Sequence, residues 1–136
     1  MNHQEHQDHQ ESTKALDAVA RAIVDSGLKV HRVLGPGLLE SAYEHCLAHE
    51  LTARGLSVAR QIALPIVYEG TPLDAGYRID LLVEDAVIVE IKAVQELTRL
   101  HEAQVLTYLK LSGRRLGLLM NFNVTLFKDG LRRLIV

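Results

Sequence analysis

The chain has 136 residues, of which 15 are Lys or Arg and 17 are Asp or Glu, so its formal net charge is −2 with neutral histidines. This balance excludes a protein that holds nucleic acid by bulk positive charge, and the length indicates one domain. The polar N-terminus lacks the apolar core of a signal peptide, and no apolar run approaches a membrane span. Cys46 is the only cysteine, which excludes an internal disulfide. We therefore expect a cytoplasmic protein with no membrane partner.

The first residues are rich in Gln, His and acidic side chains and have no apolar face. We expect residues 1–12 to form a disordered tail and residues 13–136 to form a single domain. A His-based transition-metal protein is one hypothesis, because several histidines recur at three- or four-residue spacing. These histidines are His3, His6, His9, His45 and His49.

Two helices are predicted before the first strand. Apolar residues repeat at three- and four-residue steps over residues 13–24. The Gly-Pro-Gly sequence at residues 35–37 ends this helix. A second helix is expected over residues 38–54, with Gly55 as its C-terminal stop.

Extended segments follow the helices. Residues 56–70 have the composition of a strand. Residues 77–84 and 86–93 are apolar segments separated by a tight connection, which predicts an antiparallel hairpin.

A helix over residues 100–111 and strands over residues 115–122 and 124–136 complete the chain. The predicted order is α, α, β, β, β, α, β, β. It indicates an α+β fold, a mixed α/β sandwich in which helices flank a central sheet.

Charged residues interrupt the apolar hairpin at Asp80, Glu90 and Lys92. Because side chains alternate across a strand, Glu90 and Lys92 share the face opposite Ile91. The same alternation places Asp80 opposite Ile79, and the hairpin can bring Asp80 beside Glu90.

Buried carboxylates are usually paired or bound to a metal, because burying one alone costs several kcal/mol. In a structural interpretation, Lys92 forms an ion pair with Asp80 or Glu90. In a functional interpretation, both acids are oxygen ligands of Mg²⁺ or Mn²⁺ beside Lys92, an arrangement suited to phosphodiester hydrolysis.

Two predicted helices carry polar residues that could join such a site. Glu40 and Glu44 lie one turn apart, and either could complete the metal shell. Gln104 and Tyr108 also lie four residues apart, on a stripe with His101. Solvated helix surface or a rim hydrogen bond explains each pair alone more simply, but their occurrence together favours a shared site.

Residues 37–43 read G-x-x-E-x-x-Y, and with the hairpin, residues 101–111 and residues 117–124 they resemble the GxxExxY proteins of the PD-(D/E)xK nuclease superfamily. The resemblance runs from about Gly27 to the C-terminus. It implies a restriction-endonuclease-like core of a helix, a three-stranded antiparallel unit, a helix and a further strand.

The resemblance also implies roles for particular residues. Asp80, Glu90 and Lys92 match the D…ExK signature, with Ile79 in place of the proline that gives the superfamily its name. Asp80 and Glu90 would then bind the metal, with the backbone carbonyl of Ile91 as a further ligand, and Lys92 would orient the attacking water.

Helical residues join this set by the same resemblance. Glu40 matches an acid that often completes the metal shell, and Gln104 and Tyr108 resemble the Q-x-x-x-Y element of the RecB-like branch. We therefore expect a Mg²⁺- or Mn²⁺-dependent nuclease with DNA as its substrate, and a homodimer is compatible with the apolar strands. The alternative is a nuclease-fold binding or assembly module without turnover, which the near-neutral charge favours.

Overall fold

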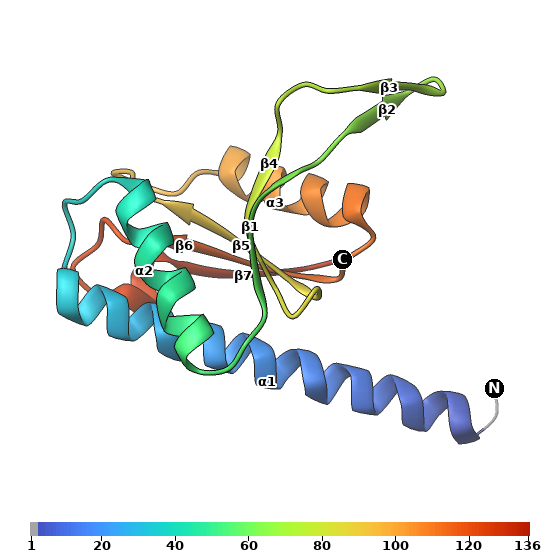
Figure 1. The fold of residues 1–136 in the computed structure, drawn as a ribbon, viewed down its shortest axis with the longest axis horizontal. Coiled ribbons are helices and arrows are strands. Elements are labelled where there is room, and N and C mark those ends of the chain that lie inside the picture. Colours follow the sequence, from blue (N-terminus) through green and yellow to red (C-terminus); the bar gives the residue numbers. More distant parts are fainter. Residues whose placement is uncertain (1–2) are drawn as a thin grey trace.

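A computed structural model of the chain describes the backbone of residues 3–136 and the side chains of residues 13–136. In chain order, the elements are α1 (His3–Leu34), α2 (Glu40–Ala53), β1 (Val58–Ala63), β2 (Ile66–Tyr68), β3 (Thr71–Leu73), β4 (Arg78–Val83), β5 (Val87–Lys92), α3 (Arg99–Ser112), β6 (Leu116–Asn121), the 3-10 helix η1 (Phe127–Gly130) and β7 (Leu131–Ile135). They form three layers, with α1 and α2 on one face of a sheet and α3 on the other (Figure 1). The predicted α+β class is confirmed.

The main sheet is mixed and has the strand order β1-β4-β5-β6-β7. Its pairs are antiparallel except β5 and β6, which run in the same direction. Parallel neighbours need a crossover connection, and α3 provides it. The sheet ends in β1 at one edge and β7 at the other.

Two apolar clusters hold the layers together, one on each face of the sheet. The larger cluster packs α1 and α2 against the sheet and includes Val89 and Ile91 of β5. The smaller cluster packs α3 against the opposite face and includes Ile88. The predicted alternation along β5 is therefore confirmed, and each buried aliphatic side chain contributes about 1.5–3 kcal/mol to stability.

The predicted hairpin of β4 and β5 is present, and three residues, 84–86, separate the paired Val83 and Val87. Glu84 and Asp85 have positive φ, 54° and 53°, as the two central residues of a type I′ turn require. The expected alternation fails at Ile79, which packs in the α3-side cluster rather than with the residues of the other face. The paired part of the hairpin ends at Leu81, so β4 is free to twist beyond that residue.

Helix α1 starts earlier than the sequence predicts. The sequence predicts a disordered tail over residues 1–12, whereas the backbone is helical from His3 and passes through most of that stretch. Gln and Glu favour helices, and they continue a helix that packing stabilises further along. Residues 1–2 lie outside the described part of the chain, as do the side chains of residues 3–12, so the boundary between tail and domain stays a prediction.

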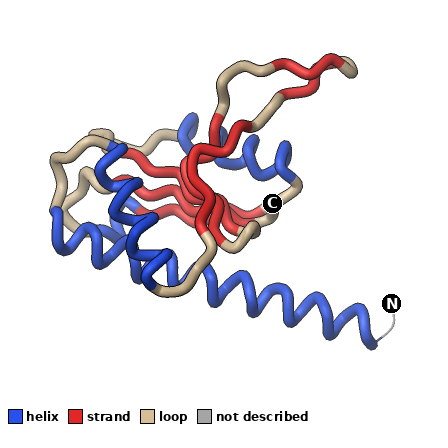
Figure 2. Tube along the Cα trace, viewed as in Figure 1, coloured by secondary structure: helices blue, strands red, loops and turns tan. Residues whose placement is uncertain are grey.

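Strands β2 and β3 form a separate hairpin that the sequence does not predict. The hairpin projects from the main sheet on the side of α3 (Figures 1 and 2). Glu69 and Gly70 turn the chain with positive φ values of 48° and 78°, and a hydrogen bond of 2.9 Å from Leu64 N to Tyr77 O closes the base. We call residues 64–77 the arm.

The C-terminal segment is shorter as a strand than predicted. Residues 124–136 are predicted to be extended throughout, but η1 interrupts them and only β7 pairs with β6. A side chain at Gly130 would place Cβ 2.1 Å from Asn121 O, so the glycine permits this close approach of backbone to backbone. Within residues 3–136, no helix has the length and apolar character needed to cross a membrane.

Candidate active site

Asp80 lies where β4 separates from β5. Backbone pairing between these strands ends at Leu81 and Val89, although the same register would next place Asp80 opposite Glu90. Instead of a backbone hydrogen bond between the strands, Ile91 N donates a hydrogen bond of 2.9 Å to the side chain of Asp80, at Oδ2. The separation of the strands leaves the rest of the carboxylate free to face other side chains.

Glu90 is the most unusual group in this region. Its side chain is only 3 % exposed, and Oε1 has no hydrogen-bond partner among the described residues. Burial, followed by the side-chain contact with Asp80 and the negative charge of Asp80, raises the pKa of Glu90 to about 10, although Lys92 acts to lower it. The two acids predicted to lie together are therefore adjacent, and Glu90 holds a proton at neutral pH unless a cation replaces it.

Lys92 lies at the end of β5 and faces α3. Its Nζ donates to Gln104 Oε1 at 3.4 Å, and Gln104 Nε2 donates to the Tyr108 hydroxyl at 3.1 Å. Burial, followed by the charges of Glu90 and Asp80, raises the pKa of Tyr108, so the phenol stays neutral. None of the four ion pairs among residues 13–136 involves Lys92, so the predicted structural ion pair does not form.

Glu40 is placed by the turn between α1 and α2. Gly37 adopts a φ of 105°, which favours glycine, and Glu40 begins α2 three residues later. The buried Tyr43 fixes this turn, because its hydroxyl donates to Gly35 O at 2.6 Å and accepts from Leu38 N at 3.1 Å. The spacing G-x-x-E-x-x-Y thus has a local structural cause.

The side chain of Glu40 points back toward the sheet. Its Oε1 accepts from Ala93 N at 3.3 Å, just beyond the end of β5. The predicted helical acid therefore lies over the C-terminal end of the strand that carries Glu90 and Lys92.

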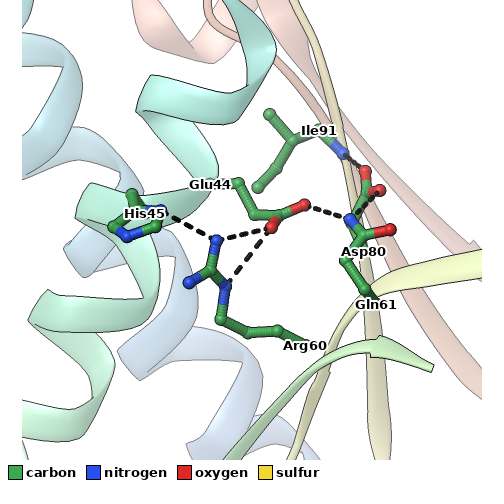
Figure 3. A network of polar contacts seen from close by, with 6 residues as sticks. All are labelled: Glu44, His45, Arg60, Gln61, Asp80 and Ile91. Carbon is green, nitrogen blue, oxygen red and sulfur yellow. Dashed lines mark hydrogen bonds and ion pairs between the residues drawn. The ribbon is translucent and has the colours of Figure 1, made fainter.

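Residues that the sequence analysis did not select connect Asp80 to α2 (Figure 3). Gln61 Nε2 donates to Glu44 Oε1 at 2.5 Å and to Asp80 Oδ1 at 3.3 Å. Arg60 Nη2 donates to Glu44 Oε2 at 2.8 Å and to His45 Nδ1 at 2.9 Å. Gln61 has a positive φ of 51° inside β1, and such strained backbone often marks a functional site.

The predicted site residues border two separate hollows. A cavity of about 370 Å³, which we call the acidic cavity, is lined by Glu40, Ser41, Glu44, Gln61, Asp80 and Ile91. A groove of about 520 Å³ between the arm and α3, which we call the arm groove, is lined in part by Lys92, Gln104 and Tyr108. Glu90 lines neither, but it contacts Asp80 on one side and contributes to the raised pKa of Tyr108 on the other, so it links the two.

A divalent cation fits part of this arrangement. Two adjacent carboxyl groups, one with a buried oxygen that lacks a partner, are the hard oxygen ligands that Mg²⁺ and Mn²⁺ prefer. However, residues 13–136 contain no group of three or more His, Cys, Asp or Glu side chains placed to hold a metal ion. Glu40 borders the same cavity as Asp80 without completing such a group.

The alternative histidine site is not formed by the described side chains. His45 Nδ1 accepts a hydrogen bond from Arg60, and no metal-ligating group includes His49. The side chains of His3, His6 and His9 lie outside the described part of the structure.

The chain belongs to the PD-(D/E)XK nuclease superfamily. The family model of that superfamily matches residues 17–134, which is most of the chain. Comparisons with curated proteins and with solved structures gave no match. The architecture, a mixed five-stranded sheet with three helices, is consistent with a restriction-endonuclease-like fold. Membership points to nuclease activity on nucleic acid, in a superfamily that generally uses divalent metals.

Proposed function

We propose that this protein is a nuclease that uses Mg²⁺ or Mn²⁺ to hydrolyse phosphodiester bonds, with DNA as its substrate. One observation carries the proposal: Asp80 lies beside buried Glu90, whose Oε1 has no partner, and Lys92 follows two residues later. Such acids are costly in a small core unless they perform a function. The motif at residues 37–43 and the helix pair Gln104 and Tyr108 support a place among GxxExxY proteins of the RecB-like branch.

Each residue has a role in this proposal. Asp80 and Glu90 would hold the cation, with Glu40 and the Ile91 carbonyl as further oxygen donors; a bound cation would act as a Lewis acid on the phosphate. Lys92 would stabilise negative charge on the phosphate and orient the attacking water. The Gln104 amide, which accepts from Lys92 and donates to Tyr108, would hold that ammonium group in place.

A second candidate is a nuclease-fold module that binds without turnover. It is favoured by the lack of a complete metal-ligating group in residues 13–136 and by the net charge of −2, which offers little attraction for phosphates. Metal binding and cleavage separate the two candidates.

The test is isothermal titration with Mn²⁺, together with a cleavage assay on labelled single-stranded and double-stranded DNA and RNA. Asp80→Asn and Glu90→Gln remove one ligand charge each and keep the side-chain size. We expect each variant to lower Mn²⁺ affinity by about tenfold or more and to abolish cleavage. Asp25→Asn, on the exposed side of α1, is the matched control and should behave like the wild type.

Equal Mn²⁺ affinity of the wild type and the Asp80→Asn/Glu90→Gln double variant would reject the metal site. Metal binding at this site without cleavage of any of the four substrates would favour the module.

A further inference from the structure

Unlike the acidic cavity, the arm groove has two walls that carry exposed apolar side chains. One wall is the arm, represented by Ile66 and Tyr77, and the other is the exposed side of α3. Leu100 on α3 is 80 % exposed and Tyr77 is 42 % exposed, although both are large apolar side chains that line the groove. Exposed apolar surface around a concave site indicates a ligand with an apolar face.

Part of the groove lining is polar. There the Lys92 ammonium, the Gln104 amide and the Tyr108 hydroxyl follow one another in a hydrogen-bonded row. The Tyr77 ring meets the Tyr108 ring edge to face, with centroids 6.3 Å apart. A flat ligand could therefore stack on an aromatic ring while its edge meets hydrogen-bonding groups.

The volume of the arm groove and the net charge of the chain further restrict the kind of ligand that can bind there. A hollow of about 520 Å³ is in the range of small-ligand pockets, so it can hold one nucleotide but not a stacked base pair with its neighbours. Because the net charge is −2, phosphate contacts alone supply little affinity, and base stacking is the other main source for a strand. Stacking of one base on an aromatic side chain raises affinity about five-fold to 150-fold.

We propose that the arm groove binds one unpaired base of the strand that is cut, so that the protein acts on single-stranded nucleic acid or unpaired ends rather than on intact duplex. This inference rests on the proposed nuclease function, because Lys92 borders the groove and would place the neighbouring phosphate beside Asp80 and Glu90. A paired base would first have to leave the duplex, at a cost of a few kcal/mol, whereas an unpaired base would not.

The test measures binding without cleavage. Fluorescence anisotropy in EDTA would compare a labelled oligothymidine with a blunt duplex of the same length, using the full chain. We expect the single strand to bind at least about tenfold more tightly than the duplex. Tyr77→Ala should weaken single-strand binding by about five-fold to 150-fold and leave duplex binding unchanged, whereas Tyr77→Phe keeps the ring and should bind like the wild type.

Two further variants keep the test independent of folding. Leu100→Ser changes an exposed residue of the groove and should weaken single-strand binding. Tyr68→Ala removes an arm tyrosine that does not line the groove, is 65 % exposed, and should have no effect. Single-strand affinities of Tyr77→Ala and Leu100→Ser equal to that of the wild type, or tighter binding of the duplex, would overturn the inference.

The outcomes distinguish this inference from the proposed function. If the single strand binds in the groove but Mn²⁺ supports no cleavage, the nuclease proposal fails and the base site stands. If Tyr77→Ala cuts single-stranded substrate as well as the wild type does, or if both cut duplex at least as well as the single strand, the base site fails and the nuclease proposal stands.

Discussion

Glu90 shows how a single carboxyl group couples folding to a ligand. It is buried with one oxygen unpartnered among the described residues, and it contacts Asp80. In the absence of a cation, Glu90 keeps its proton, because burial and the neighbouring negative charge of Asp80 disfavour its ionised form. A bound divalent cation would compete with that proton, so Mn²⁺ affinity should rise with pH.

Glu90→Gln should change how stability depends on pH. The ordinary pKa of 4.5 applies in the unfolded chain and about 10 in the folded chain, so between these values the folded state binds more protons. The wild-type free energy of unfolding should therefore decrease as pH rises, by about 1.4 kcal/mol per pH unit from this group, and the variant should lack that contribution. Urea unfolding in EDTA at about pH 5, 7 and 9 measures the difference.

The control for this experiment is Glu96→Gln, an exposed glutamate in the loop after β5, which should keep the wild-type pH dependence. Parallel curves for the wild type and Glu90→Gln would show that the Glu90 proton is not retained in the folded state.

The sequence predicts some site residues better than others. Asp80 and Glu90 can be placed together because they lie on neighbouring strands of a tightly connected hairpin, although the exact register depends on a three-residue connection, residues 84–86. Gln61 cannot be predicted, since its importance comes from one side chain that reaches both Glu44 and Asp80 across two elements. A contact of this kind, between side chains of different elements, leaves no periodic pattern in the sequence.

At the scale of elements, the turn before α2 determines where Glu40 lies. The Tyr43 ring stacks on Phe122 with centroids 4.6 Å apart, and its hydroxyl bonds the turn on both sides. One tyrosine therefore joins the turn, α2 and the end of β6. This explains in physical terms why Tyr43 lies three residues after Glu40, on the buried side of the helix.

Tyr43→Phe should distinguish the contribution of the Tyr43 hydroxyl to stability from that of the Tyr43 ring. The variant keeps the stack on Phe122 but leaves Gly35 O and Leu38 N without their buried partner. We expect a loss of roughly 1–3 kcal/mol in the free energy of unfolding, measured by urea denaturation. Tyr68→Phe, on the exposed arm, should change it by less than about 0.5 kcal/mol. A Tyr43→Phe stability equal to that of the wild type would mean that water replaces the hydroxyl at no cost.

Element types are more predictable than element lengths. The helices after residue 13 and the β4–β5 hairpin follow from strong periodicity or apolar runs. The arm is missed because its strands have three residues each, too few to show alternation. The last strand is predicted too long because η1 contains Phe127, an apolar residue that a strand would also accommodate.

At the scale of the molecule, the composition indicates the protein class less well than the motifs do. A net charge of −2 argues against nucleic-acid binding, yet the chain belongs to a nuclease superfamily. The conflict disappears if affinity comes from a local groove rather than from the overall charge. The fold class follows from the order of elements, but the division into two hollows depends on how the arm projects beside α3.

The outermost strands bear on self-association. β7 leaves one side of its backbone without a neighbouring strand, and it carries Arg132 and Arg133 in succession, on opposite faces of the sheet, with Arg133 paired to Asp17. Joining two copies through this strand would bring like charges near each other on each face of the sheet, which disfavours fibre-like stacking. Replacing both by valine should produce concentration-dependent oligomers in sedimentation velocity, whereas the unaltered chain should resist this route. A homodimer, with which the sequence is compatible, would therefore use a surface other than this edge.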